Sequence, residues 1–419
     1  FIDTKEKSSI RVSAEAARFI PGHAKAIDLN SGGVVFLDDF EGTQSQISME
    51  FPINRWALSS TPQGVNILNS DVNNDLSYGF QRAQFSLYKI DPSFRREVDG
   101  DENSHYTRQV LLREVFPQTQ FQPGQSILRT LDILYDPTEP GPYNFTVDGL
   151  DQNGKLTNPK ESWGGMTREL ELNDFQFHNI EYIEFWMMDP FLENPTHDGG
   201  SLYFDLGTVS EDVLRDGRRS FENGLPTPGQ PENTDTTSWA RVSNNNVISR
   251  FFDSDTTNRR VQDVGFDGLD NAGETVVFSD YIAAINNRQD LAQGVKNEIV
   301  ADPANDDFKF FTDYPAETGL LDRYTRFNAP QGNSIAQDEN NSRGLVSTST
   351  NLPDTEDLNG DNSIEQSETY YQYKIDLHPD MMVGEDFITN IQEGTGDTTL
   401  STPSRWLKFQ IPIAEFQNQ

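Results

Sequence analysis

The stretch "IEYIEFWMMDPF", residues 180–191, carries the strongest fold signal in the sequence. Ile183, Phe185 and Met187 fall on one face of an extended chain, because successive side chains of a β-strand point to opposite sides. The opposite face is also rich in aromatic and methionine side chains. The pattern therefore predicts a β-strand that is covered on both faces.

The same alternation recurs in "SLYFDLGTV" (201–209), "YYQYKIDL" (370–377) and "RWLKFQIPIAEF" (405–416). The side chains predicted to face inward in these three stretches are Leu202, Phe204 and Leu206, then Tyr371, Tyr373, Ile375 and Leu377, and finally Leu407, Phe409, Ile411 and Ile413. Pro412 has no amide hydrogen for a β-ladder, so it is expected at an edge or at the end of its strand.

Shorter segments complete the prediction of secondary structure. Further strands are predicted within residues 34–40, 55–60, 84–90 and 126–135, and the better helical patterns cover 106–116 and 279–293. The predicted fold class is therefore mainly β: a jelly-roll-like β-sandwich with a long loop-rich insertion and a few short helices.

The domain organisation is read from a change of composition. Residues 218–367 are rich in Asn, Asp, Gly, Thr and Pro, whereas strand-like segments stand on both sides of them. We expect an N-terminal lead-in at 1–32, a sandwich built from 33–217 and 368–419, and an insertion at 218–367 that carries the calcium-loop candidates. The alternative is that the insertion is a separate linker. The first residues, "FIDTKEKSSI", suggest a piece of a longer protein.

Charge and composition exclude several kinds of partner. The chain has 419 residues with 32 Lys and Arg against 67 Asp and Glu, which gives a net charge of −35. Such a surface repels phosphate backbones, so no nucleic acid partner is expected. There are no cysteines, and the five histidines show no metal-binding spacing, which argues against zinc. The composition does not exclude sites that bind a cation through oxygen ligands, and Ca²⁺ as a structural ion is the expected cofactor.

The segment "DLNGDNSIEQSE", residues 357–368, resembles a twelve-residue calcium loop. Its ligand positions fall on Asp357, Asn359, Asp361, Ser363, Glu365 and Glu368. Asn362 stands where glycine usually makes the sharp turn, although asparagine tolerates left-handed backbone angles. The alternative is a polar turn held by local hydrogen bonds.

Two weaker calcium candidates exist elsewhere. "DVGFDGLDNAGE" offers Asp263, Asp267, Asp270 and Glu274, but Gly265 occupies a ligand position, and a turn around Gly268 is the competing interpretation. Glu41, in "DDFEG", is a third candidate, because related jelly rolls often hold calcium near that strand.

No catalytic motif is present. The sequence lacks a G-x-S-x-G elbow, a P-loop and a G-x-G-x-x-G loop, so no enzyme is expected. Trp163 lies between "ES" and two glycines and is the best candidate for stacking against a sugar ring. Trp186 and Trp406 lie in strands and are expected in the core.

Several separated blocks together resemble one family. They are "DDFEG", "GPYNF", "GLDQNGKLTNPKESWGGMTREL", "NIEYIEFWMMDPFL", "SLYFDLGTVSEDVLRDGRRSFENGLP", "VQDVGFDGLDNAGE", "RYTRFNAPQGNS" and "YYQYKIDLHPDM". The blocks are similar to SprA, also called Sov, the outer-membrane translocon of the type 9 secretion system of Bacteroidetes. The resemblance covers nearly the whole chain.

The resemblance implies a role in protein secretion and gliding motility. Such a translocon is a giant single-chain β-barrel with soluble insertions, and this chain would be one insertion, in the extracellular cap at the outer membrane. Its partners would be the remainder of its own barrel, secreted client proteins and partner proteins of the translocon, and the fragment itself would be monomeric. The alternative is a cell-surface carbohydrate-binding module of jelly-roll type.

Overall fold

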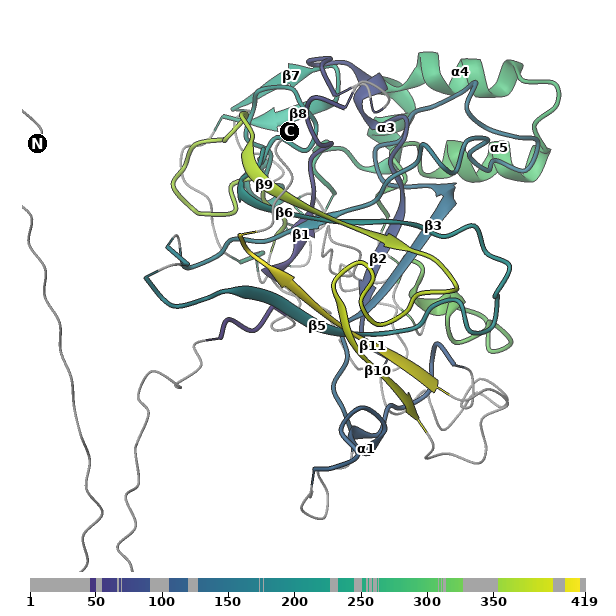
Figure 1. Cartoon of the computed structure of the whole chain (residues 1–419). Coiled ribbons are helices and arrows are strands. Elements are labelled where there is room, and N and C mark those ends of the chain that lie inside the picture. The colour runs from purple at the N-terminus through teal and green to yellow at the C-terminus, as the bar shows by residue number, and fades with distance from the viewer. Residues whose placement is uncertain are drawn as a thin grey trace, which may run out of the picture. The chain divides into compact units, whose positions relative to one another are not determined.

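The computed structural model describes residues 46–49, 55–90, 105–119, 127–226, 233–244, 251–326, 353–394 and 404–414, with short gaps inside some of these ranges (Figure 1). The predicted N-terminal lead-in and the predicted strand at 34–40 lie outside the described residues. Among the residues that are described, no helix is long and apolar enough to cross a membrane.

The described chain is built mainly from β-strands. The strands are β1 (Ala57–Leu58), β2 (Ala83–Tyr88), β3 (Asp132–Pro140), β4 (Met166–Thr167), β5 (Tyr182–Met188), β6 (Gly200–Thr208), β7 (Thr234–Thr237), β8 (Ala240–Ser243), β9 (Thr369–Leu377), β10 (Ile388–Gly394) and β11 (Ser404–Pro412). The helices are α1 (Leu112–Val115), α3 (Asn271–Val277), α4 (Ser279–Asn287) and α5 (Gln293–Ala301), with 3₁₀ turns at Leu76–Gly79, Glu222–Gly224 and Asp322–Tyr324. The prediction of a mainly β fold is confirmed.

The stretch 180–191 contains β5. This strand lies at one side of a three-stranded antiparallel sheet in the order β10-β11-β5. Phe185 stands opposite Phe409 in the register, and their rings stack with centroids 4.8 Å apart. Pro412 pairs with Tyr182 at the last position of β11, which confirms the prediction that it ends a strand.

A second sheet joins strands that are far apart in the sequence. β6 pairs with β9 in an antiparallel register that runs from Gly200 opposite Leu377 to Thr208 opposite Thr369 (Figure 1). One hydrophobic cluster contains inward side chains of both sheets, and Phe185 of β5 packs against Phe204 of β6 with ring centroids 5.4 Å apart. The two sheets therefore share a core that contains most of the side chains predicted to face inward. The prediction for Tyr371 is wrong, because this side chain is 54 % exposed and lies outside the core.

Three further antiparallel strand pairs, β1-β4, β2-β3 and β7-β8, complete the described sheets. Their strands differ from the predicted segments in length: β1 is only two residues long, and β3 begins at Asp132 instead of 126. The helical pattern at 106–116 yields only the single turn of α1, while the pattern at 279–293 ends after Asn287. A jelly-roll topology stays a prediction.

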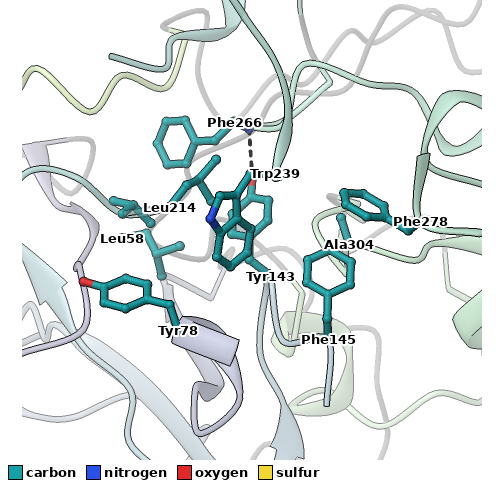
Figure 2. Close-up of a cluster of buried hydrophobic side chains, with 10 residues drawn as sticks. Leu58, Tyr78, Tyr143, Phe145, Leu214, Trp239, Phe266, Phe278 and Ala304 are labelled. Carbon is teal, nitrogen blue, oxygen red and sulfur yellow. Dashed lines mark hydrogen bonds between the residues drawn. The ribbon is translucent and has the colours of Figure 1, made fainter. Parts of the chain in front are cut away.

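The helices α3, α4 and α5 follow one another and pack together (Figure 1). Phe278 and Tyr281 connect them to a second, aromatic core. Figure 2 shows this core, in which Tyr143 and Phe145 meet Trp239, Phe266 and Phe278. Tyr143 accepts a hydrogen bond from the backbone N–H of Phe266 at 2.9 Å. Two of the sequence blocks, 141–145 and 261–274, are thus brought together here, and this core positions the candidate site.

Candidate metal centre

The loop 357–368 has the backbone of a tight polar turn in which acidic side chains bind their own chain. Asp357 is 3 % exposed, and its two carboxylate oxygens accept hydrogen bonds from the N–H groups of Asp361 at 3.1 Å and Asn362 at 2.9 Å. Gly360 and Asn362 both have positive φ, at 70° and 69°. Asn362 thus adopts the left-handed conformation that was expected of it in place of glycine.

The other predicted ligands of this loop also find local partners. Asn359 Oδ1 accepts from the N–H of Asp361 at 2.8 Å, and Asp361 accepts from both the N–H and the hydroxyl of Ser363. Glu365 binds the N–H and hydroxyl of Ser367 in the same way. These hydrogen bonds lower the pKa of Asp361 and of Glu365, because they favour the charged form.

Glu368, the twelfth loop residue, is turned toward a different segment. Its Oε2 accepts from the N–H of Gln63 at 2.8 Å, and burial raises the pKa of its carboxyl group. In the described part of the chain, groups of three carboxylates with oxygens within 4.8 Å lie elsewhere. The structure therefore keeps the loop compact without gathering its carboxylates at one point, and calcium binding by this loop stays a prediction.

Buried carboxylates outside the loop hold it in place. Glu356 is 1 % exposed and accepts three backbone N–H bonds, from Val213 at 2.8 Å, Leu214 at 3.2 Å and Ser220 at 2.8 Å. Glu211 accepts from the N–H groups of Leu358 and Glu365, at 3.1 and 3.2 Å. The segment that leads into β9 is thus fixed against residues 211–220 by backbone amides that bind acidic side chains.

The second predicted calcium segment is divided by the structure. Asp263 lies outside the described residues, and Asp270 is the N-cap of α3, where its Oδ1 accepts from the N–H of Gly273 at 2.9 Å. Asp267 and Glu274 instead turn inward, and each is 1 % exposed. There they meet Asp306, which follows α5 in the sequence and is 4 % exposed.

These three residues, Asp267, Glu274 and Asp306, form what we call the buried acidic centre. One carboxylate oxygen of each lies within 4.8 Å of the corresponding oxygens of the other two. Glu274 Oε2 accepts from the N–H of Ala304 at 2.9 Å, and Asp267 Oδ1 accepts from the N–H of Leu269 at 2.9 Å. The fold thus concentrates three acidic groups where water has little access.

Burial and mutual repulsion both disfavour the charged forms of this centre. The pKa of Glu274 is raised to about 8, first by burial and then by neighbouring acids such as Asp302. The pKa values of Asp267 and Asp306 are raised well above the ordinary range for the same two reasons. A bound cation would reverse this balance, since it favours carboxylates over carboxylic acids.

A second acidic group overlaps the first. Asp302, Asp306 and Asp307 also bring carboxylate oxygens within 4.8 Å of one another. Here Asp302 has a cationic partner, because Arg326 lies 2.8 Å from its Oδ2, and Asp307 accepts from the side-chain amide of Asn271 at 2.8 Å. The carboxylates of Asp302 and Asp307 therefore already have partners within the protein, a guanidinium group for Asp302 and an amide donor for Asp307.

The remaining candidates are placed as follows. Glu41 lies outside the described residues. Trp163 is half-buried, and the guanidinium carbon of Arg82 sits 5.6 Å from its ring centroid. One face of the indole is thus covered by Arg82, which reduces the area open to a sugar. Trp406 is 4 % exposed and lies in the core as expected.

Sequence reasoning did not find Asp306. Its neighbours in the sequence, "DPANDDF", gave no loop spacing, and its position beside Asp267 depends on how the chain returns after α5. The only available signal was the local density of acids at residues 302–307.

Comparison with known protein families gives a match. Residues 280–419 match the family model SprA_N, described as a motility related/secretion protein. This match confirms the resemblance indicated by the sequence blocks for the part of the chain that contains α4, α5 and β9 to β11. No curated protein matches the chain.

Proposed function

Residues 280–419 belong to the SprA_N family of motility related/secretion proteins, and from this premise we propose that the chain is an extracellular cap insertion of a type 9 outer-membrane translocon. The family match is the observation that carries the proposal. In this role the chain shapes or closes the outer end of the pore, and it catalyses no reaction.

The pairing of strands supports extending the proposal beyond the matched residues. β9 and β11 lie inside the matched range, whereas their partners β6 and β5 precede it. Strands that share hydrogen bonds and a hydrophobic core fold together. Residues 182–208 are therefore part of the same structural unit as the matched segment, and a role assigned to one applies to both.

The expected partners are the rest of the translocon and its secreted clients. Two tyrosines, Tyr203 and Tyr371, are 48 % and 54 % exposed on the β6-β9 sheet. They provide aromatic area and a hydroxyl group, a combination that is enriched where proteins bind one another.

The test is site-specific crosslinking within the full-length translocon in its own cell. A photoreactive residue is placed at position 203 or 371, and at position 280 on the exposed side of α4 as a comparison. We expect adducts with the remainder of the translocon, with a secreted client, or with both. If no position yields such an adduct, and deletion of residues 48–419 leaves secretion and outer-membrane permeability unchanged, the proposal is wrong.

The carbohydrate-binding alternative has less support. It needs an exposed aromatic face, and the face of Trp163 toward Arg82 is occupied. A glycan array that gave specific binding, abolished by Trp163→Ala, would favour this alternative over the translocon role.

A further inference from the structure

We propose that the buried acidic centre of Asp267, Glu274 and Asp306 is a structural site for a hard divalent cation, with Ca²⁺ as the preferred ion. The proposal does not depend on a role in secretion. It changes the ligand set expected from the sequence, because Asp270 caps a helix and Asp306 joins from a later segment.

The first argument is an oxygen atom that has no other partner. Asp267 is 1 % exposed, and its Oδ1 is bound by the N–H of Leu269 at 2.9 Å. Its Oδ2 is buried, and no hydrogen-bond donor within the described residues reaches it. A buried carboxylate oxygen without a donor is costly, and a cation is the partner that would relieve this cost.

The second argument is distance. Two oxygens bound to one Ca²⁺ at about 2.3–2.6 Å can be up to about 5 Å apart, whereas Mg²⁺ at about 2.0–2.1 Å limits that separation to about 4 Å. The three oxygens of the centre all lie within 4.8 Å of one another. All three oxygens are therefore within reach of one calcium ion, and water can complete its six to eight ligands.

The third argument concerns the charges that surround the site. The groups acting on Asp267 are other acids, namely Glu274, Asp302 and Asp270. Arg326 lies beside the overlapping acidic group, where it pairs with Asp302 at 2.8 Å. No ion pair between described residues involves Asp267 or Glu274, so an external cation has a charge to neutralise.

The backbone beside the centre leaves room for the ligands. Gly265 has φ of 77°, and a Cβ atom there would lie 2.1 Å from Asp306 Oδ2 and 3.0 Å from the Tyr143 hydroxyl oxygen. Only a glycine allows this approach. The ion would connect the turn before α3, the helix itself and the segment after α5, which all border the core in Figure 2.

The test compares two isosteric substitutions that each remove one acidic charge. Asp267→Asn can keep the oxygen that binds Leu269 N–H, so the turn is retained. Asp307→Asn is the matched control, because Asp307 is exposed, lies one residue after Asp306 and belongs only to the overlapping group. Both are made in the 419-residue chain with Asp361→Ala and Glu368→Ala, so that the loop 357–368 does not contribute to binding.

Calcium binding is measured by isothermal titration after chelation, with MgCl₂ titrated separately. We expect Asp267→Asn to weaken calcium binding at least tenfold and Asp307→Asn to change it less than about threefold. Equal losses in both variants would mean that the cation responds only to the general acidic field. Absence of binding to the parent chain would also overturn the proposal, as would a clear preference for magnesium.

Thermal unfolding provides a second readout. The substitution Asp267→Asn is expected to change the melting temperature differently in calcium and in chelator. If a cation neutralises the centre, Asp267→Asn lowers the melting temperature in millimolar calcium, because a ligand is lost. With chelator, the same variant melts at or above the parent, because one repelling charge is gone. A variant that is more stable than the parent in both conditions would show that the centre holds protons instead of a cation.

Discussion

A buried ion pair between Arg108 and Glu114 of α1 also accepts a hydrogen bond from the C-terminal strand β11, and we expect its removal to destabilise the whole described unit. Arg108 donates two hydrogen bonds to Glu114, at 2.8 and 2.5 Å, and the side chains are 6 % and 7 % exposed. Trp406 of β11 donates its indole N–H to the same carboxylate at 2.8 Å. Glu114→Gln keeps the shape but removes the charge.

The magnitude follows from what the substitution leaves behind. The amide oxygen of glutamine can still accept one or two of these hydrogen bonds, but Arg108 becomes a buried cation without a counter-charge. Breaking a buried pair in this way costs about 3–5 kcal/mol. With a urea m-value of about 3 kcal/mol/M, which is typical of a larger unit, the unfolding midpoint should fall by at least about 1 M.

The effect should also depend on pH with a definite sign. Burial alone would raise the pKa of Glu114, but hydrogen bonds from Arg108, Trp406 and Ser404 outweigh it and hold the pKa below its ordinary 4.5. An acid with a lowered folded-state pKa stabilises the fold above its unfolded-state pKa, and this contribution is lost as pH falls through the folded-state value. The difference between parent and variant should therefore be full at pH 7 and shrink below about pH 4.

The assay is urea unfolding followed by tryptophan fluorescence, with Glu171→Gln as the control. Glu171 pairs with Arg55 at the surface, where the two side chains are 71 % and 50 % exposed, so this control should not move the midpoint measurably. Equal midpoints for the parent and Glu114→Gln at pH 7, or a difference that does not change with pH, would refute the reasoning.

Three further outcomes are expected. Chelation should lower the melting temperature of the chain more than that of an Asp361→Ala, Glu368→Ala variant if the loop 357–368 binds calcium, and equal responses would identify the loop as a turn only. Glycosides, peptides and esters should not be hydrolysed, and turnover that disappears on substitution of one carboxylate would contradict this. Gly265→Ala should destabilise the chain, because the added methyl would lie 2.1 Å from Asp306 Oδ2, and an unchanged midpoint would count against that geometry.

Local periodicity was sufficient to predict most of the inward-facing side chains of the main strands. The alternation of Ile183, Phe185 and Met187 needs only the two-residue repeat of a strand, and all three side chains pack into the shared core of the two sheets. The lengths of short elements could not be predicted in this way. At 106–116 the helical pattern gives a single turn, because tertiary contacts decide where a marginal helix ends.

The candidate site was predictable only in part, since its members come from separate segments. Asp267 and Glu274 follow from one motif, but Asp306 lies more than thirty positions later in the sequence. Likewise, Trp406 meets Glu114 across 292 positions. No local spacing indicates such contacts, because they depend on how helices and strands pack after they form.

The excess of acidic residues has a structural use that composition alone does not reveal. Glu356 accepts three backbone N–H bonds and Asp357 accepts two, so these buried carboxylates fix loops that have no regular hydrogen bonding of their own. A backbone amide and a bound cation are alternative partners for a buried carboxylate. Backbone amides at residues 213–220 bind the buried carboxylate of Glu356. The Oδ2 of Asp267, in contrast, has no hydrogen-bond donor among the described residues. Calcium should therefore matter most at the buried acidic centre, and Glu356→Gln should destabilise the chain equally with calcium or chelator.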